Sequence, residues 1–379
     1  MILDSDFATF LQDIRPTGPM RDDLKTGHQT LRARLNADEG LKKCLVSDFL
    51  QGSYKRSTAI RPKGDRRSDV DIIVVTRLSE QEYRPAQAMA LFEPFLEKHY
   101  KGKWRRQGRS FGIELSYVAL DLVLTSAPSE TELGILKAEA LSSDDDLDVA
   151  RDWRLHRSWL SIDARQSRAD ARTLLTEAKK EAEWKAHPLR IPDRDANQWE
   201  STHPIAQIIW TRDKNDRTNK HFVNVVKAIK WWRVENHEQP EHPKGFPLER
   251  LVGECCPDSI ESVAQGIVGT LESMVSKYSL TVASGGSPSL PDYGVPSHNV
   301  LKRVSAADFA EFYKQVASGA ALARRALDSQ DRTESGNLWR KLFGVKFPKP
   351  PDNGGGSGGS DRGYTPPTTP AVPGSGRFA

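Results

Sequence analysis

Three aspartates have the chemistry and the spacing of metal ligands. Asp69 and Asp71 lie two residues apart in the run Asp-Val-Asp-Ile-Ile-Val-Val, and Asp121 interrupts the apolar run Val-Ala-Leu-Asp-Leu-Val-Leu. Side chains alternate along a strand, so Asp69 and Asp71 are expected on one face. Two carboxylates side by side repel unless a cation lies between them, and such oxygen ligands suit Mg²⁺ or Mn²⁺. The pattern predicts two divalent ions and in-line transfer of a phosphoryl or nucleotidyl group.

A Gly-Ser turn precedes the aspartates in the chain. Gly52 lets the backbone approach a phosphate closely, and Ser53 adds a hydroxyl and an N–H donor. The turn is therefore expected to hold the β and γ phosphates of a nucleoside triphosphate, while the ions hold the α phosphate. Taken singly, a Gly-Ser pair is typical of an ordinary turn, and Asp-Val-Asp of a solvated strand end. Their order along one chain favours the catalytic interpretation.

The elements that must position these residues follow from the hydrophobic pattern. Short β-branched runs predict buried strands, and apolar residues three and four apart predict amphipathic helices. The predicted strands cover 70–76, 111–117 and 118–124, and the predicted helices cover 21–49 and 84–98. This mixture indicates an α+β lobe with a small mixed sheet over residues 1–150, which includes an N-terminal helix.

The chain changes character after about residue 150. Strand runs are absent, and helices are expected at 164–186, 204–214, 219–234, 257–277 and 305–328. Residues 151–350 are therefore predicted to form a helical second lobe. Eight Gly and four Pro lie between residues 353 and 379. Such a segment buries too little apolar surface to fold, so residues 351–379 are expected to form a disordered tail.

Composition excludes several classes of protein. The 55 Lys and Arg against 51 Asp and Glu give a net charge of +4, too balanced for a dedicated nucleic-acid coat protein. No apolar run is long enough for a membrane span, and the first residues lack the pattern of a secretory signal. With three cysteines, a cytoplasmic protein without a disulfide framework is expected. No CxxC pair supplies the usual zinc ligands, which weighs against a zinc site. The sequence does not decide whether Cys255 and Cys256 bind zinc.

Together these residues resemble a known superfamily. Gly52-Ser53, Asp69-Val70-Asp71 and Leu120-Asp121 resemble the motifs of the DNA polymerase β-like nucleotidyltransferases. The longer run 51–62 resembles the bacterial cGAS/DncV-like nucleotidyltransferases, the oligonucleotide cyclases of CBASS antiviral systems. The similarity extends over about residues 20–340. It implies a polymerase β-like lobe and a helical lobe that enclose a cleft, with Gln51, Gly52 and Ser53 against the nucleotide.

The resemblance continues in the helical lobe. The run 222–233 is similar to the family helix whose lysine reaches the triphosphate, and the run 291–300 is similar to a loop beside the nucleotide. On this resemblance, the further nucleotide-binding residues are Lys230, Lys227, Asp292 and Asn299.

The resemblance implies a metal-dependent cyclase that joins ATP, GTP or other nucleoside triphosphates into a cyclic di- or trinucleotide and releases pyrophosphate. A separate effector protein would read the product. For the tail two alternatives stay open: conjugation by a ubiquitin-transfer-like enzyme, or a plain disordered end without a partner. Neither a membrane nor nucleic acid is required. Two alternatives stay open: a linear nucleotidyltransferase, of the oligoadenylate-synthase or RNA-end-adding kind, and an inactive nucleotide-binding module. The sequence does not determine the bases, the ring size or the linkage.

Overall fold

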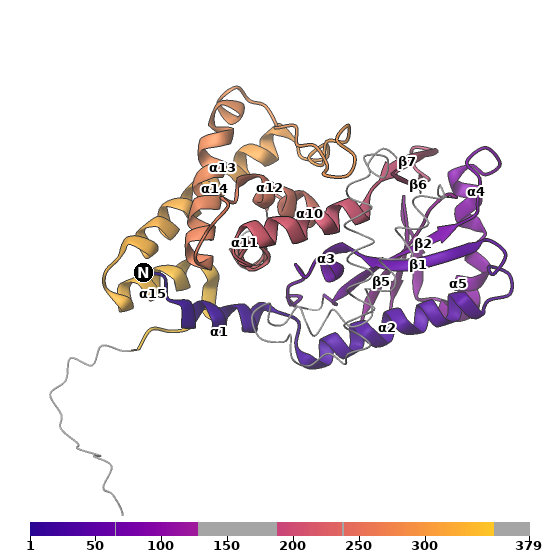
Figure 1. Ribbon diagram of the computed structural model, residues 1–379, viewed down its shortest axis with the longest axis horizontal. Coiled ribbons are helices and arrows are strands. Elements are labelled where there is room, and N and C mark those ends of the chain that lie inside the picture. The colour runs from indigo at the N-terminus through magenta and orange to yellow at the C-terminus, as the bar shows by residue number, and fades with distance from the viewer. Residues whose placement is uncertain (65, 128–187, 237–238, 352–379) are drawn as a thin grey trace, which may run out of the picture.

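A five-stranded mixed sheet forms the first of two lobes, here called the sheet lobe (Figure 1). The computed structural model describes residues 1–64, 66–127, 188–236 and 239–351. The strand order is β1-β2-β5-β4-β3, in which β2 and β5 are parallel and the other pairs are antiparallel. The strands are β1 (Leu45–Gln51), β2 (Asp69–Thr76), β3 (Trp104–Arg106), β4 (Phe111–Glu114) and β5 (Ala119–Leu124). The predicted mixed sheet is confirmed.

The alternation of side chains on β2 divides the core of the sheet lobe into two layers. Val70, Ile72 and Val74 pack against three helices on one face. These helices are α2 (Gly18–Ala37), α4 (Pro85–Ala90) and α5 (Glu93–Tyr100). Ile73 and Val75 point to the other face, the face that Asp69 and Asp71 share by the same alternation.

The second face of the sheet is covered by elements that lead into the other lobe. Ile73 and Val75 form a small core with residues of β6 (Leu189–Asp193) and of α10 (Pro204–Arg217). β6 pairs in an antiparallel hairpin with β7 (Gln198–Thr202). This core fixes α10 against the sheet and connects the two lobes.

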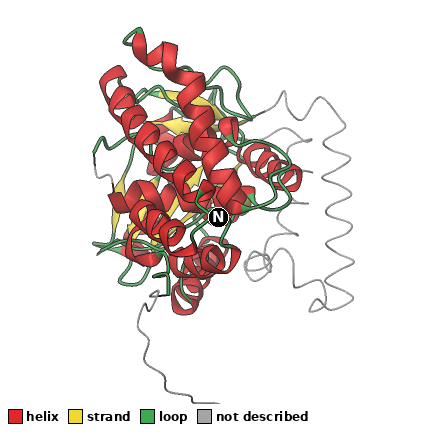
Figure 2. Ribbon diagram, turned by 90° about the vertical axis from the view of Figure 1, so that its left-hand side faces the viewer, coloured by secondary structure: helices red, strands yellow, loops and turns green. Residues whose placement is uncertain are grey.

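The helical lobe has one core, built by α11 to α15 and by the N-terminal helix. α1 (Asp4–Ile14) precedes the sheet lobe in the chain, yet Phe7 and Phe10 pack against aromatic residues near the end of the helical lobe. Figure 2 shows these helices in front of the strands. The elements are α11 (Phe222–Asn236), α12 (Phe246–Cys255), α13 (Val263–Ala283), α14 (Ala306–Asp328), α15 (Arg332–Phe343) and the 3₁₀ helix η1 (Gly344–Lys346).

Two predicted elements are wrong. The helix expected over 21–49 ends at Ala37, because Asp38 accepts hydrogen bonds from the backbone of Gly40 and Leu41 and turns the chain. The following residues form β1, since strand pairing with β2 overrides the helical spacing. The hairpin of β6 and β7 contradicts the expectation that strands are absent after residue 150.

The helix predicted at 84–98 is divided into α4 and α5, because Pro94 has no amide N–H to continue the hydrogen bonds of α4. The other predicted elements of the described residues are confirmed, with shifted ends. The helix predicted at 257–277 begins at Val263, where the Ser262 side chain accepts a hydrogen bond from the Gln265 amide. The predicted helix 164–186 and the expected tail lie outside the described residues, and the lobe boundary at 150 does too. No helix in the described ranges combines the length and hydropathy needed to cross a membrane.

Candidate active site

The pairing of β2 with β5 brings the three predicted aspartates together. Asp71 is the register partner of Asp121, and Asp69 lies one alternation away on the same face. Each of the three side chains offers a carboxylate oxygen within 4.8 Å of the others. The structure therefore gathers into one cluster the acids that the sequence separates by 50 residues.

The Gly-Ser turn lies against this cluster. β1 ends at Gln51, the register partner of Asp71, and the short helix α3 (Gly52–Lys55) begins at the next residue. Gly52 has a φ of 76°, and a Cβ there would come within 1.7 Å of Asp71 Oδ2. Only glycine satisfies both the left-handed backbone and this contact. In Figure 1, α3 lies between the two lobes.

The electrostatics of the three carboxylates favour a bound cation. Loss of hydration and the negative charges of Asp71 and Asp121 raise the pKa of Asp69 to about 8, although Asp69 is the most exposed of the three. Burial and the charge of Asp71 raise the pKa of Asp121 to about 6. Burial also raises the pKa of Asp71, against the attraction of Arg56. A cluster of hard oxygen donors that is strained by its own charge fits Mg²⁺ or Mn²⁺.

A buried ion network joins the two lobes beside the aspartates. Glu249 of α12 accepts hydrogen bonds from Arg56 Nε at 3.0 Å and from Lys230 Nζ at 2.9 Å. Lys230 Nζ also donates to the Thr58 carbonyl at 3.0 Å. Burial alone would raise the pKa of Glu249, but Arg56 and Lys230 outweigh it and hold the pKa at about 2. The network places the predicted Lys230 beside the loop that follows the Gly-Ser turn.

Lys227 lies one helical turn before Lys230 and has a different environment. Its side chain is buried, and burial together with the charges of Arg15 and Lys230 holds its pKa well below the usual range. Arg15, in the connection between α1 and α2, donates to Asn224 Oδ1 at 2.9 Å. Within the part of the chain that the structure describes, no ion pair or hydrogen bond of the Lys227 ammonium is found.

The predicted base-pocket residues are held within their own loop. Asn299 Oδ1 accepts from the backbone amides of Leu290 and Leu301, both at 2.9 Å. Asp292 accepts from the Gly294 amide at 2.7 Å and from the Gln207 side chain at 2.9 Å. These contacts stabilise the loop against α10. The role of Asp292 and Asn299 beside a base stays a prediction.

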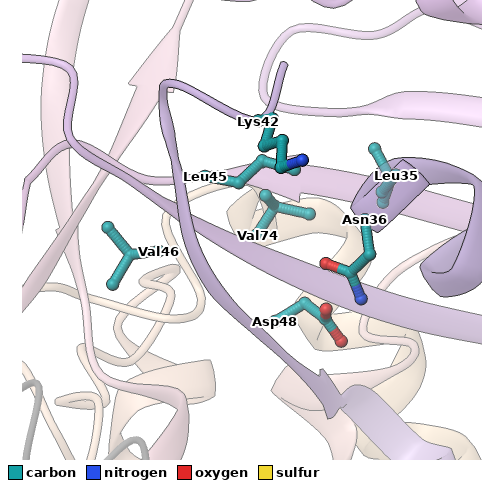
Figure 3. A pocket seen from close by; sticks show the side chains of 7 residues that line it. All are labelled: Leu35, Asn36, Lys42, Leu45, Val46, Asp48 and Val74. Carbon is teal, nitrogen blue, oxygen red and sulfur yellow. The ribbon is translucent and has the colours of Figure 1, made fainter. Parts of the chain in front are cut away.

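A cavity lies away from the aspartates, and the described side chains show no metal cluster that includes the cysteines. The cavity (Figure 3) is lined by Asn36 and Lys42 together with Asp48 and Val74. Val74 belongs to the α2 face of the sheet, so this cavity lies behind the sheet from the aspartates. Cys255 and Cys256 are buried free thiols, and the aspartate cluster is the one candidate metal-ligand group found among described side chains.

Three residues near the aspartates were not identified as functional from the sequence. Glu249 and Arg56 lie 193 residues apart, and neither shows a pattern that pairs it with the other. Gln107, which donates to Asp121, lies in a turn without a motif. The sequence offers one sign of the role of Glu249, which is that this acid lies in an otherwise apolar helix face, in the run Leu-Glu-Arg-Leu. An acid at such a position indicates a buried cationic partner, but not which residue it is.

The chain is similar in sequence to two named synthases. Residues 1–128 match the family described as the Second Messenger Oligonucleotide or Dinucleotide Synthetase domain. A "Cyclic AMP-AMP-GMP synthase" of Enterobacter hormaechei subsp. hoffmannii (strain UCI 50) and a "Probable cyclic AMP-AMP-GMP nucleotide synthase" of Salmonella paratyphi B are both similar over their full lengths. Each is 48% identical over 386 residues, and the match covers 100% of this chain and 100% of the relative.

Solved structures share the fold at lower identity. The Bradyrhizobium diazoefficiens CD-NTase CdnG in complex with GTP has a TM-score of 0.62 and 13% identity, covering 90% of this chain and 95% of that chain. The Escherichia coli MS115-1 CdnC:HORMA-deltaN complex has a TM-score of 0.58 and 15% identity, covering 92% of this chain and 99% of that chain. These likenesses confirm the predicted fold, a small mixed sheet with a helical second lobe.

Removing the charges of Asp69 and Asp71 should stabilise the metal-free protein at high pH. A carboxyl whose pKa is raised on folding binds more protons in the folded state, so stability falls as pH rises from about 4 to about 8. With chelator at pH 8.5, Asp69→Asn with Asp71→Asn should raise Tm by roughly 2–4 °C, the effect of about 1 kcal/mol. At pH 5 the gain should nearly vanish. Thermal melts at both pH values measure this.

The control Asp22→Asn with Asp23→Asn removes the same two charges from α2 and should leave the melting temperature nearly unchanged. Added Mg²⁺ should stabilise the wild type more than the active-site variant. A lower Tm for that variant at pH 8.5 with chelator would contradict the interpretation of the cluster as a strained cation site.

Proposed function

The chain belongs to the bacterial cGAS/DncV-like nucleotidyltransferases, the cyclic oligonucleotide synthases, and from this membership we propose that it joins two ATP and one GTP into a cyclic AMP-AMP-GMP second messenger. The observation that carries the choice of product is the full-length identity of 48% to two synthases of that name. The aspartate cluster supports the chemistry, because nucleotidyl transfer needs closely spaced carboxylates. We propose further that the product acts through a separate effector in antiphage (CBASS) defence.

Asp69, Asp71 and Asp121 are proposed to hold two divalent cations, Mg²⁺ or Mn²⁺. Bound there, such ions neutralise phosphate charge and favour loss of the attacking hydroxyl's proton. Asp69 and Asp71 would contact both ions, and Asp121 would complete the site beside the attacking hydroxyl. A ribose hydroxyl of one nucleotide forms a bond to the α phosphorus of another, and the bond to the departing pyrophosphate breaks. Repetition of this step lengthens the chain, and a final attack closes the ring.

The triphosphate is proposed to lie between the Gly-Ser turn and α11. Gln51, Gly52 and Ser53 would approach it from the sheet lobe, and Lys230 would approach it from the helical lobe. Glu249 holds Lys230 at this position through the buried network. No acid found in the described ranges compensates the burial of the Lys227 ammonium, so a bound phosphate would offset the cost of burying this charge. Asp292 and Asn299 remain the proposed contacts on the side of the base.

Incubation with ATP and GTP and Mg²⁺ should give a phosphatase-resistant product with the mass of a cyclic AMP-AMP-GMP, together with pyrophosphate. No primer should be needed, because the ring is built from free nucleotides. Mass spectrometry after phosphatase treatment measures the outcome, and Asp69→Asn with Asp71→Asn serves as the inactive control. Products that all carry a phosphatase-sensitive end would replace this proposal with linear transfer, and absence of any product would favour the inactive module.

Lys227→Met should weaken triphosphate binding and at the same time stabilise the fold. Loss of a charged hydrogen bond of about 1.5–3 kcal/mol weakens ATP binding about tenfold or more. Removal of a buried cation raises Tm, since the charge is costly when no ligand is bound. ATP titration by calorimetry and thermal melts measure both effects.

Two comparisons sharpen the Lys227 test. Lys230→Met should weaken ATP binding but lower Tm, because it removes one partner of Glu249. Lys314→Met, on the exposed side of α14, should change neither quantity. Unaltered ATP affinity in Lys227→Met would show that Lys227 does not contact the nucleotide.

We propose that the Gly- and Pro-rich stretch 353–379 serves a partner, such as a ubiquitin-transfer-like conjugating enzyme, and not catalysis. No residue proposed for the active site lies in it. Deletion of residues 353–379 should leave the rate of product formation within about twofold of the wild type, because a segment with so few large apolar residues contributes little to a packed core. The same deletion should abolish conjugation in cells that carry the neighbouring genes. A large loss of activity in vitro would contradict this assignment.

A further inference from the structure

Gln107 contacts Asp121 from a turn outside the strands that carry the aspartates. Its side-chain Nε2 donates to Asp121 Oδ1 at 3.2 Å. Its Oε1 accepts from the Ser110 hydroxyl at 2.6 Å. Both ends of the amide are therefore engaged, and the Ser110 hydroxyl fixes which end faces the carboxylate.

The sheet leaves a space that this amide fills. At one level of the sheet, β1, β2, β5 and β4 contribute Gln51, Asp71, Asp121 and Gly112 as successive register partners. The fourth position has no side chain, and a Cβ on Gly112 would come within 2.6 Å of Gln107 Nε2. Gly112 thus admits the Gln107 amide to the side of Asp121 that faces away from Asp71.

The turn that carries Gln107 is held by hydrogen bonds within the turn and by contacts with the hairpin of β6 and β7. Within the turn, the backbone N–H of Gln107 donates to the backbone carbonyl of Ser110 at 2.9 Å. From the hairpin of β6 and β7, the Arg194 N–H donates to the Gly108 carbonyl at 2.8 Å. Arg109 Nε lies 2.8 Å from Asp193 Oδ2 in the same hairpin. These contacts restrict the Gln107 backbone, so its side chain has little freedom to leave Asp121.

The charge of the donor matters as much as its position. Among the charged groups around Asp121, Asp69 and Asp71 repel it, and the Arg105 guanidinium, which attracts it, is paired with Glu114. A neutral amide orients the carboxylate without cancelling the negative charge that attracts a cation. A lysine or arginine at this position would compete with that cation. Gln107 belongs to a known kind of residue, which holds a metal ligand in place without touching the metal. Mutation of such a residue typically lowers metal affinity or activity by roughly 10–100-fold.

We propose that Gln107 is a positioning residue that fixes the Asp121 carboxylate, so that its second oxygen is presented to the cation shared with Asp69 and Asp71. This inference rests on the proposed function only in that the aspartate cluster binds a divalent ion. Gln107 itself touches neither the ion nor the nucleotide. Its effect is on how well Asp121 is oriented before the ion arrives.

Binding of Mn²⁺ to the full-length protein, followed by electron paramagnetic resonance, tests the proposal independently of turnover. Gln107→Leu keeps a side chain of similar size and removes the donor, and we expect roughly 10–100-fold weaker Mn²⁺ binding. Ser110→Ala releases the far end of the amide and should give a smaller loss in the same direction. The Mg²⁺ concentration for half-maximal product formation should rise in parallel, while the rate at saturating Mg²⁺ changes less.

Gln265→Leu is the matched control, because this glutamine accepts a hydrogen bond from the Glu261 amide at the start of α13, away from the cluster. It should bind Mn²⁺ as the wild type does. Wild-type affinity in Gln107→Leu overturns the proposal and leaves the proposed function intact. If Gln107→Leu fails to fold, Ser110→Ala decides: wild-type Mn²⁺ affinity in that variant overturns the proposal.

The two proposals fail separately. A wild-type protein that binds Mn²⁺ but forms no cyclic product refutes the proposed function, and the Mn²⁺ titrations of Gln107→Leu still support or overturn the role of Gln107. A wild-type protein that binds no Mn²⁺ overturns both.

Discussion

Repulsion among three carboxylates on one face of a sheet is the constraint to which the rest of the site responds. β2 and β5 are parallel and pair Asp71 directly with Asp121, so these negative charges cannot separate without breaking the ladder. Burial, together with the negative charges of the neighbouring carboxylates, raises the pKa values of Asp69 and Asp121. The neighbours of the three carboxylates each have a matching property: Gly52 leaves room for the Asp71 carboxylate, and Gln107 donates a neutral hydrogen bond to Asp121.

The cationic groups beside the aspartates are arranged differently, because they come from both lobes. Arg56 follows the Gly-Ser turn, whereas Lys230 belongs to α11, and the buried Glu249 holds both. Breaking one partner of such a network leaves an uncompensated buried charge, which is strongly unfavourable. The relative position of the lobes is therefore tied to the electrostatics of the site. A triphosphate placed between the acidic sheet and the cationic helix would contact both lobes at once.

The sequence predicted the elements where local pattern and tertiary packing agree. The β-branched run of β2 is a strand on every local criterion, and in the observed sheet it lies between β1 and β5. The prediction for 21–49 was wrong because helical spacing of leucines continues past Ala37 while the chain turns at Asp38. The hairpin of β6 and β7 escaped notice because its strands are short, and one contains proline. At β1, pairing with β2 decided the structure, and no local pattern encodes that pairing. The β6–β7 pairing is local, but the hairpin packs on the sheet through contacts with residues far away in the sequence.

What the sequence determined by itself was the chemistry of the cluster, because the period of two puts Asp69 and Asp71 on one face. The sequence explained Gly52 by the approach of a phosphate, whereas the structure shows that the Asp71 carboxylate leaves no room for a side chain there. The tertiary structure alone decided which groups complete the cluster. Glu249 meets Arg56 across 193 residues, and Gln107 reaches Asp121 only because Gly112 leaves a gap in the adjacent strand. Periodicity states which face a side chain occupies. The partner on that face depends on how distant segments pack, and that information lies in the folded chain and not in any single run of residues.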